Sequence, residues 1–166
     1  PCDGHEMRLA VEALINYNGP AYLRLARPAT EIITDEIPGY SFELGKGATL
    51  CGGKDVTIIA TGIMVPQAMK AAEALENDGI SARVIDMHTI KPLDVEAVTA
   101  AINDIGKVIT VEDHNIINGL GSAVCEVAAE MGKGLVKRVG IRDQFGQSAP
   151  YERLLAMNGV TVEDIV

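Results

Sequence analysis

The feature that most constrains the fold is an alternation of short apolar runs with longer amphipathic segments between residues 55 and 157. Four short runs are rich in β-branched residues, as strands are: DVTIIAT (55–61), ISARVIDM (80–87), KVITVE (107–112) and LVKRVGI (135–141). Because most of their positions are apolar, we expect these strands to be buried on both faces. Strands of this kind, joined by helices, predict an α/β fold with a parallel sheet covered on both sides.

Between and after these strands lie segments with apolar residues at helical spacing. They cover residues 64–78, 94–105, 121–131 and 150–157. Pro66 lies early in the first segment, where its missing N–H costs least, and Gly79 follows its end. Asp94 is suited to cap the second helix. These boundary signals support the same order of elements as the strand pattern.

Upstream, YSFELGKGATLCGG (40–53) predicts an additional strand with a glycine-rich exit. Only a short turn separates it from the strand at 55–61, and a parallel pair would need a longer crossover connection. We therefore expect this first strand to run antiparallel at the edge of the sheet.

The amino-terminal segment does not continue the alternation. Asp3-x-x-Glu6 is a capping-box variant that predicts a helix, which Asn18-Gly19-Pro20 ends, and AYLRLAR (21–27) then predicts a strand. The apolar face of this helix would be Met7, Val11, Leu14 and Ile15. One helix and one strand cannot bury their own apolar faces. We interpret residues 1–27 as the remnant of a preceding α/β domain, residues 28–45 as a linker and residues 46–166 as the main domain.

At the other end, Thr161-x-x-Asp164 is a second capping pattern, but the chain stops one turn later at Val166. A helix of that length is marginal, so we expect this end either to be cut short or to fray.

Charge and cysteine content narrow the classes of function. The net charge of -9 argues against nucleic acid or an anionic membrane as partner, since both favour a basic face. No apolar run approaches the roughly 20 residues that cross a bilayer, and we find no signal peptide. The 3 cysteines are far apart in the chain, which favours reduced thiols and a cytoplasmic protein.

The segment VEDHNIINGLGSAV (111–124) permits three interpretations. A dinucleotide site is suggested by Gly119-x-Gly121, but Val124 replaces the third glycine and the glycines lie too far from the strand. A catalytic cluster is suggested by Glu112, Asp113 and His114, but side chains alternate along a strand. The third interpretation is structural and is the one we favour: small residues and Asn118 allow a tight turn into a closely packed helix. His88, alone at a strand end, is likewise read as structural.

Arg27 is the one candidate for ligand binding. It ends the predicted strand 21–27, and ligands of parallel α/β sheets bind beyond the carboxyl ends of strands. A guanidinium there suits a phosphate or carboxylate. The alternative is a surface ion pair with Glu31, Asp35 or Glu36. Arg24, on the opposite face, is expected to be solvated or paired.

Four segments together resemble the C-terminal part of transketolases, with the split bacterial forms most similar. They are GPAYLRLARPAT (19–30), residues 55–94 ending in IKPLD, VEDHNIINGLGSAVCEVAAE (111–130) and DQFGQSAPYERLLAMNGVT (143–161). The motifs IKPLD and FGxSxP are the most specific. 1-Deoxyxylulose-5-phosphate synthases and 2-oxo acid dehydrogenase beta subunits share a looser version of the pattern.

The resemblance implies a three-layer α/β/α sandwich with a five-stranded mixed sheet whose first strand is antiparallel. It also implies a homodimeric enzyme that transfers a two-carbon ketol unit between sugar phosphates. Thiamine diphosphate and a divalent metal (Mg) would bind outside this segment, in N-terminal domains or a separate subunit. The resemblance assigns residues 1–27 to the pyrimidine-binding domain and Arg27 to the substrate phosphate. It assigns no catalytic, cofactor-binding or metal-binding residue to this chain.

On this basis we expect the chain to be inactive alone. Three alternatives stay open: the corresponding part of deoxyxylulose phosphate synthase, that of a 2-oxo acid dehydrogenase beta subunit, and a non-catalytic dimerisation or assembly module.

Overall fold

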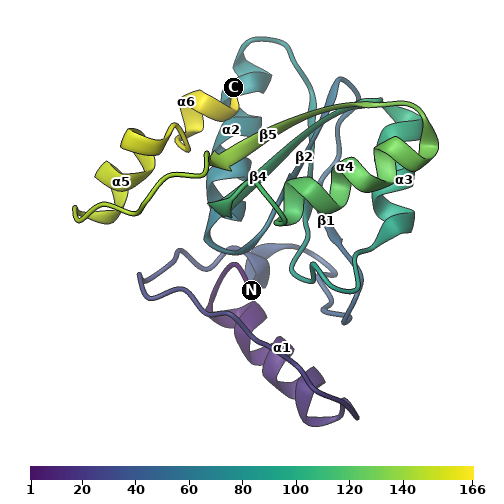
Figure 1. Ribbon diagram of the computed structural model, residues 1–166. Helices are drawn as coiled ribbons and strands as arrows, with labels where there is room; N and C mark the ends of the chain where they lie inside the picture. The colour runs from purple at the N-terminus through teal and green to yellow at the C-terminus, as the bar shows by residue number, and fades with distance from the viewer.

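A computed structural model describes all residues, 1–166, and its centre is a mixed five-stranded sheet in the order β1-β3-β2-β4-β5 (Figure 1). The strands are β1 (Ala48–Cys51), β2 (Val56–Ala60), β3 (Ala82–Asp86), β4 (Lys107–Asn115) and β5 (Leu135–Ile141). β1 pairs antiparallel with β3, and every other pair is parallel. The predicted antiparallel edge strand is therefore confirmed, although it is shorter than residues 40–53. Gly45 has a positive φ of 83° before the strand begins.

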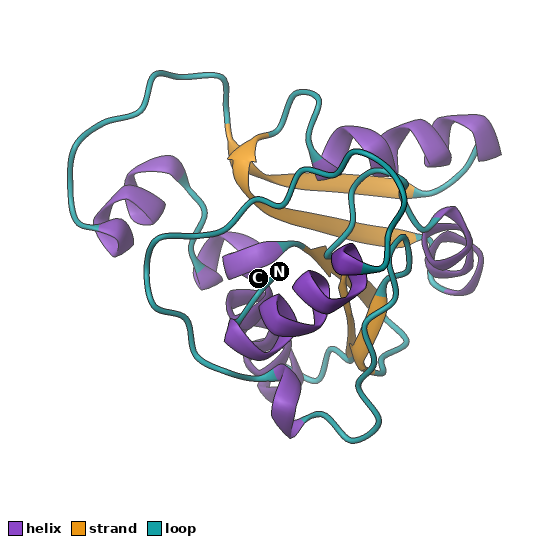
Figure 2. Ribbon diagram, turned by 90° about the horizontal axis from the view of Figure 1, so that it is seen from below, coloured by secondary structure: helices purple, strands orange, loops and turns teal.

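Helices cover both faces of this sheet, so the predicted three-layer arrangement is confirmed (Figures 1 and 2). The helices of the chain are α1 (Gly4–Ile15), α2 (Val65–Asn77), α3 (Val95–Asp104), α4 (Leu120–Met131), α5 (Tyr151–Asn158) and α6 (Val162–Ile165), with 3-10 turns η1 (Thr34–Glu36) and η2 (Gly62–Met64). α2 and α6 pack together on one side, and α3 and α4 on the other. None of the helices has the length and apolar character needed to cross a membrane.

The two faces of the sheet have separate apolar cores. On β2, Ile58 contributes to the core beneath α2, whereas Ile59 contributes to the core beneath α3 and α4. Both side chains are completely buried. This is the two-sided burial that the continuous apolar runs predict, because successive side chains of a strand point to opposite faces.

The predicted strand at residues 21–27 is wrong for this chain. The segment lies in no sheet, and Tyr22 is 89% exposed and Leu25 55% exposed. A strand needs a neighbour to pair its backbone groups, and no strand of this sheet lies beside the segment. The helix predicted before this segment is confirmed as α1. The C-terminal end of α1 is left uncovered by the rest of the chain, since Ile15 is 76% exposed.

The prediction of a fraying C-terminus is also wrong. The Thr161 backbone N–H donates to the Asp164 carboxylate at 2.9 Å, and the Thr161 hydroxyl donates to the same carboxylate at 2.7 Å. Ile165 is completely buried in the core beneath α2. Tertiary packing therefore stabilises a helix that is too short to persist alone.

Candidate functional site

A cavity of about 1120 Å³ lies beyond the C-terminal ends of the central strands. Its walls come from the segments after β2 and β3, from the end of β4 and from the extended segment after α1: residues 61–63, 88–92, 112–114 and 20–28. This is the edge of a parallel α/β sheet at which ligands bind.

Arg27 is exposed and lines this cavity. Its guanidinium makes no hydrogen bond and no ion pair within the chain. Two of the three acids proposed as partners face other groups: Glu31 lies 3.4 Å from the Lys70 ammonium, and Asp35 lies 3.9 Å from the His5 imidazole. The ion-pair alternative is therefore not realised, and the guanidinium is free to bind an anion.

Arg24 faces the same cavity in a different way. One of its terminal nitrogens donates to the Asp113 backbone carbonyl at 3.4 Å. The side chain is thus paired, as expected, and it ties the extended segment loosely to the end of β4.

Two histidines reach the cavity from neighbouring strand ends. The His88 ring stacks on Phe42 at a centroid distance of 4.1 Å, and its Nδ1 lies 2.9 Å from the Thr89 hydroxyl. Burial lowers the pKa of His88, so the ring is neutral near pH 7. The His114 ring is exposed, and its Nδ1 lies 3.1 Å from the Asn115 carbonyl. Neither ring has a carboxylate that would orient it as a catalytic base, in agreement with the structural interpretation of His88.

Glu112 is a residue whose role sequence analysis missed. It is completely buried at the end of β4, and its two carboxylate oxygens accept the backbone N–H groups of Leu120 and Gly121, each at 2.8 Å. These donors belong to the first turn of α4, where a nucleotide-binding fold would hold phosphate. Burial raises the pKa of Glu112, while the two amides oppose that shift. The chain's own carboxylate therefore occupies the position of a diphosphate.

The two glycines of this turn are explained by the close approach of neighbouring side chains. A Cβ at Gly119 would lie 1.9 Å from a Glu112 carboxylate oxygen, and a Cβ at Gly121 would lie 2.8 Å from Thr110 Oγ1 and from two Arg138 side-chain carbons. The only left-handed residue of the turn is Asn118, with φ of 61°. VEDHNIINGLGSAV is therefore a self-capped strand–turn–helix, as the structural interpretation holds, with close approach instead of positive φ as the reason for its glycines.

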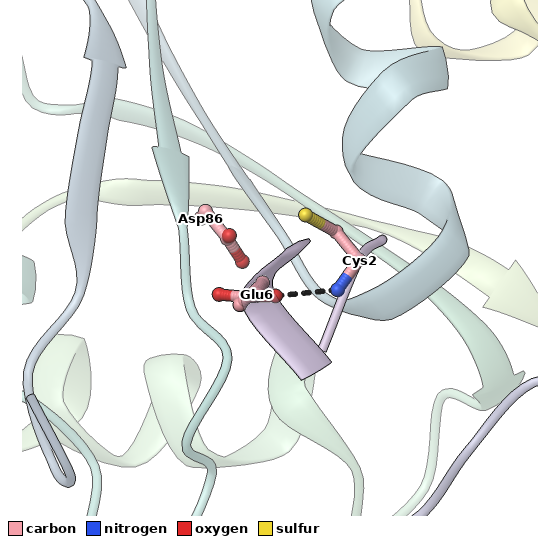
Figure 3. A group of neighbouring side chains, drawn as sticks. All are labelled: Cys2, Glu6 and Asp86. Carbon is pink, nitrogen blue, oxygen red and sulfur yellow. Dashed lines mark hydrogen bonds between the residues drawn. The ribbon is translucent and has the colours of Figure 1, made fainter. Parts of the chain in front are cut away.

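One group of side chains has the composition of a metal site. The ligating atoms of Cys2, Glu6 and Asp86 all lie within 4.8 Å of one another and are buried (Figure 3). Burial, with the nearby carboxylates adding to it, raises the pKa of the Cys2 thiol, so the thiol stays protonated. A protonated thiol is a poor metal ligand.

The sheet order, the antiparallel edge strand and the self-capped turn define a three-layer α/β domain that carries an anion-binding candidate at its edge. The family model described as "Transketolase, C-terminal domain" matches residues 45–165. The chain therefore belongs to the transketolase C-terminal-domain family.

Similar proteins cover the whole chain. A transketolase C-terminal section from Methanocaldococcus jannaschii is 45% identical, over 99% of this chain and 52% of that protein. A 6-deoxy-6-sulfo-D-fructose transketolase subunit from Clostridium sp. is 42% identical, over 100% and 51%. A 1-deoxy-D-xylulose-5-phosphate synthase from Heliobacterium modesticaldum is 33% identical, over 99% and 26%. The chain thus spans about half or less of the length of these relatives.

A solved structure agrees with these matches. It is described as a split-gene transketolase, an inactive beta4 tetramer, and it superposes with a TM-score of 0.93 at 43% identity. It covers 100% of this chain, which covers 54% of it. Such agreement at this identity confirms the fold of the entire segment, including residues 1–44 outside the family match.

Proposed function

We propose that this chain is the C-terminal portion of a thiamine-diphosphate-dependent transketolase that transfers a two-carbon ketol unit between sugar phosphates in the cytoplasm. The observation that carries the proposal is the free guanidinium of Arg27, exposed at the edge of the sheet beside a cavity large enough for a small ligand. A phosphate there would accept two parallel hydrogen bonds from the planar guanidinium.

The uncovered apolar surface supports an N-terminal partner, either a preceding domain or a separate subunit. Residues 21–27 are extended with unpaired backbone groups, and the outer turns of α1 expose Val11 and Ile15. An extended segment with unpaired backbone groups is suited to join the sheet of another unit. We infer that residues 21–27 become a strand in the complete enzyme, which also forms a homodimer.

The cofactor is proposed to bind in the missing portion. The residues present here do not fit a diphosphate, since Glu112 fills the first turn of α4 and would repel it. No step of the reaction is therefore assigned to side chains of this chain beyond substrate binding. The description of a similar chain as an inactive tetramer supports the expectation that this chain alone has no activity.

The second candidate function is 1-deoxyxylulose-5-phosphate synthesis, supported by the 33% identity to such a synthase. The complete enzyme should be assayed for both products. Sedoheptulose 7-phosphate from xylulose 5-phosphate and ribose 5-phosphate supports transketolase, and 1-deoxyxylulose 5-phosphate supports the synthase. Absence of both would favour a 2-oxo acid dehydrogenase subunit or an assembly module.

Arg27→Ala in the complete enzyme tests the phosphate-binding role. A charge-assisted hydrogen bond to a ligand is worth about 1.5–3 kcal/mol, so kcat/KM for xylulose 5-phosphate should fall about 10- to 150-fold. The value for unphosphorylated xylulose should not change. Arg24→Ala is the matched control, since Arg24 lines the same cavity but donates to a backbone carbonyl. Equal losses for both ketoses would contradict the role of Arg27.

A further inference from the structure

Two carboxyl groups face each other where the first turns of α1 meet the sheet (Figure 3). Glu6 lies in α1 and Asp86 ends β3, and both residues are 0% exposed. No lysine, arginine or histidine forms an ion pair with either of them. Their ligating oxygens lie within 4.8 Å of each other. Two ionised carboxylates this close together and completely buried would repel strongly, because water cannot screen them.

The two groups differ in their hydrogen bonds. Glu6 accepts the Tyr40 hydroxyl at 2.6 Å on one oxygen and the Cys2 backbone N–H on the other. Asp86 has no donor on either oxygen, although both oxygens are completely buried. β1 and β2 flank Asp86 on both sides, with Ala48 and Ala60 in register with it. A buried ionised carboxylate without a donor would be very costly.

We propose that Glu6 and Asp86 share one proton, so that a neutral Asp86 carboxyl donates to the Glu6 carboxylate and thereby fastens α1 to the sheet. This arrangement gives Asp86 its missing partner and leaves a single negative charge, which Tyr40 and the Cys2 amide already stabilise. Carboxyl pairs that share a site in this way hold one proton over a wide range of pH.

The direction of the pKa shifts agrees with this geometry. Burial first, then the charge of Glu6, raises the pKa of Asp86 well above its usual value. Burial also disfavours ionised Glu6, but the hydrogen bonds from Asp86, Tyr40 and the Cys2 amide outweigh it and lower the pKa of Glu6. The two groups thus titrate as a pair and not as independent acids.

Asp3 joins the same contact to a third segment. Its carboxylate accepts the backbone N–H groups of Glu6, Ile33 and Thr34, each at 2.8 Å. The start of α1, the η1 region and β3 therefore meet at one joint. Both ends of the segment that carries Arg27 are held there, since α1 precedes it and η1 follows it.

The pair makes this joint sensitive to pH. Other titratable groups also face it: the thiol of Cys2, the carboxylate of Asp3, the hydroxyl of Tyr40, the ring of His88 and the amine of Pro1. Burial raises the pKa of both Cys2 and Tyr40, so neither ionises in the physiological range. Because the folded pKa of Asp86 is raised, its stabilisation is complete below the unfolded pKa and is lost as pH rises through the folded pKa.

Hydrogen exchange of the complete protein between about pH 5 and 9 tests the proposal. Protection factors of the first α1 amides, corrected for intrinsic exchange, should fall about tenfold per pH unit until the pair has lost its proton. The protection factors of the α2 amides should not show this dependence on pH. Asp86→Asn keeps the shape of a neutral acid but cannot ionise, so its α1 protection should be independent of pH. A flat profile in the unmodified protein would overturn the proposal.

Asp3→Asn is the matched control, since Asp3 is a buried acid of the same joint with a complete set of donors. It should weaken α1 protection at every pH while retaining the slope. Carbon-13 spectra of the side-chain carboxyls give a readout that needs no variant: at pH 6 one resonance should report a neutral acid. Two ionised carboxylates at that pH, or a rise in melting temperature with Zn²⁺ that needs Asp86, would show that no proton is shared.

Discussion

Two completely buried glutamates hold two helices to the same sheet, and they do so in different ways. Glu112 takes its two donors from the helix that follows it directly in the chain. Glu6 takes its partners from Cys2, Tyr40 and Asp86, which are spread over much of the sequence. The first contact belongs to one strand–turn–helix unit, whereas the second exists only when separate segments meet. The α4 junction, at which Glu112 accepts the Leu120 and Gly121 amides, therefore forms within the domain. The α1 joint, at which Glu6 meets Cys2, Tyr40 and Asp86, is a contact between the amino-terminal segment and the domain.

Gly119→Ala should show how little freedom the α4 junction has. The added Cβ would lie 1.9 Å from a Glu112 carboxylate oxygen and 2.9 Å from the Asn115 carbonyl. We expect a loss of about 3 kcal/mol or more in the free energy of unfolding, because the carboxylate must leave its buried donors. Urea unfolding measures the loss. Gly52→Ala is the control, since nothing lies within 4 Å of that position and its stability should hardly change. A tolerated Gly119→Ala would mean that the junction can relax.

The two glutamates should respond to pH with opposite signs. Burial raises the pKa of Glu112, so its contribution to stability is present below the unfolded pKa and is lost as pH rises through the folded pKa. The folded pKa of Glu6 is lowered, so its contribution is present above the unfolded pKa and is lost as pH falls.

Glu112→Gln and Glu6→Gln convert this difference into a measurement. Between about pH 3 and 7, the stability lost through Glu112→Gln should shrink, chiefly above the unfolded pKa of about 4.3, while the loss through Glu6→Gln should grow, chiefly below that pKa. Melting temperatures across this range give both slopes. Parallel slopes would show that the two sites do not differ in the way that their hydrogen bonds indicate.

The same contrast explains what the sequence could predict. The strands and the helices of the domain follow local patterns, and β2 with α2 is a clear example, since apolar spacing and Pro66 both indicate it. The structural interpretation of residues 111–124 was also accessible, because a glycine-rich turn between a strand and a helix has few uses. The sequence indicates the position of Glu112 at the N-terminus of α4 only weakly. The one sign is an acid at the end of an apolar strand, shortly before the glycines.

The failures arise where non-local contacts decide. Residues 21–27 have the composition of a strand, but strand formation depends on a neighbour that this chain does not supply. The short α6 was underestimated because the burial of Ile165 cannot be read from a four-residue capping pattern. The pairing of Glu6 with Asp86 joins distant positions in the sequence, so no local pattern reveals it. Arg27 was found because a strand-end position and a family motif coincide.

Tyr40→Phe and Ser122→Ala compare the two contacts by a single hydroxyl each. The Tyr40 hydroxyl donates to a buried carboxylate at 2.6 Å, whereas the Ser122 hydroxyl accepts the Asn118 N–H at 2.9 Å and donates to the Ile116 carbonyl at 3.0 Å. A bond to a charged group is worth about 1.5–3 kcal/mol and a neutral one about 0.5–1.5 kcal/mol. Tyr40→Phe should therefore cost more in unfolding free energy, and exchange should increase selectively in α1. Ser122→Ala should affect only the first turn of α4, where Glu112 still holds two amides. If Tyr40→Phe loosened α4 as much as α1, the two junctions would be one cooperative unit.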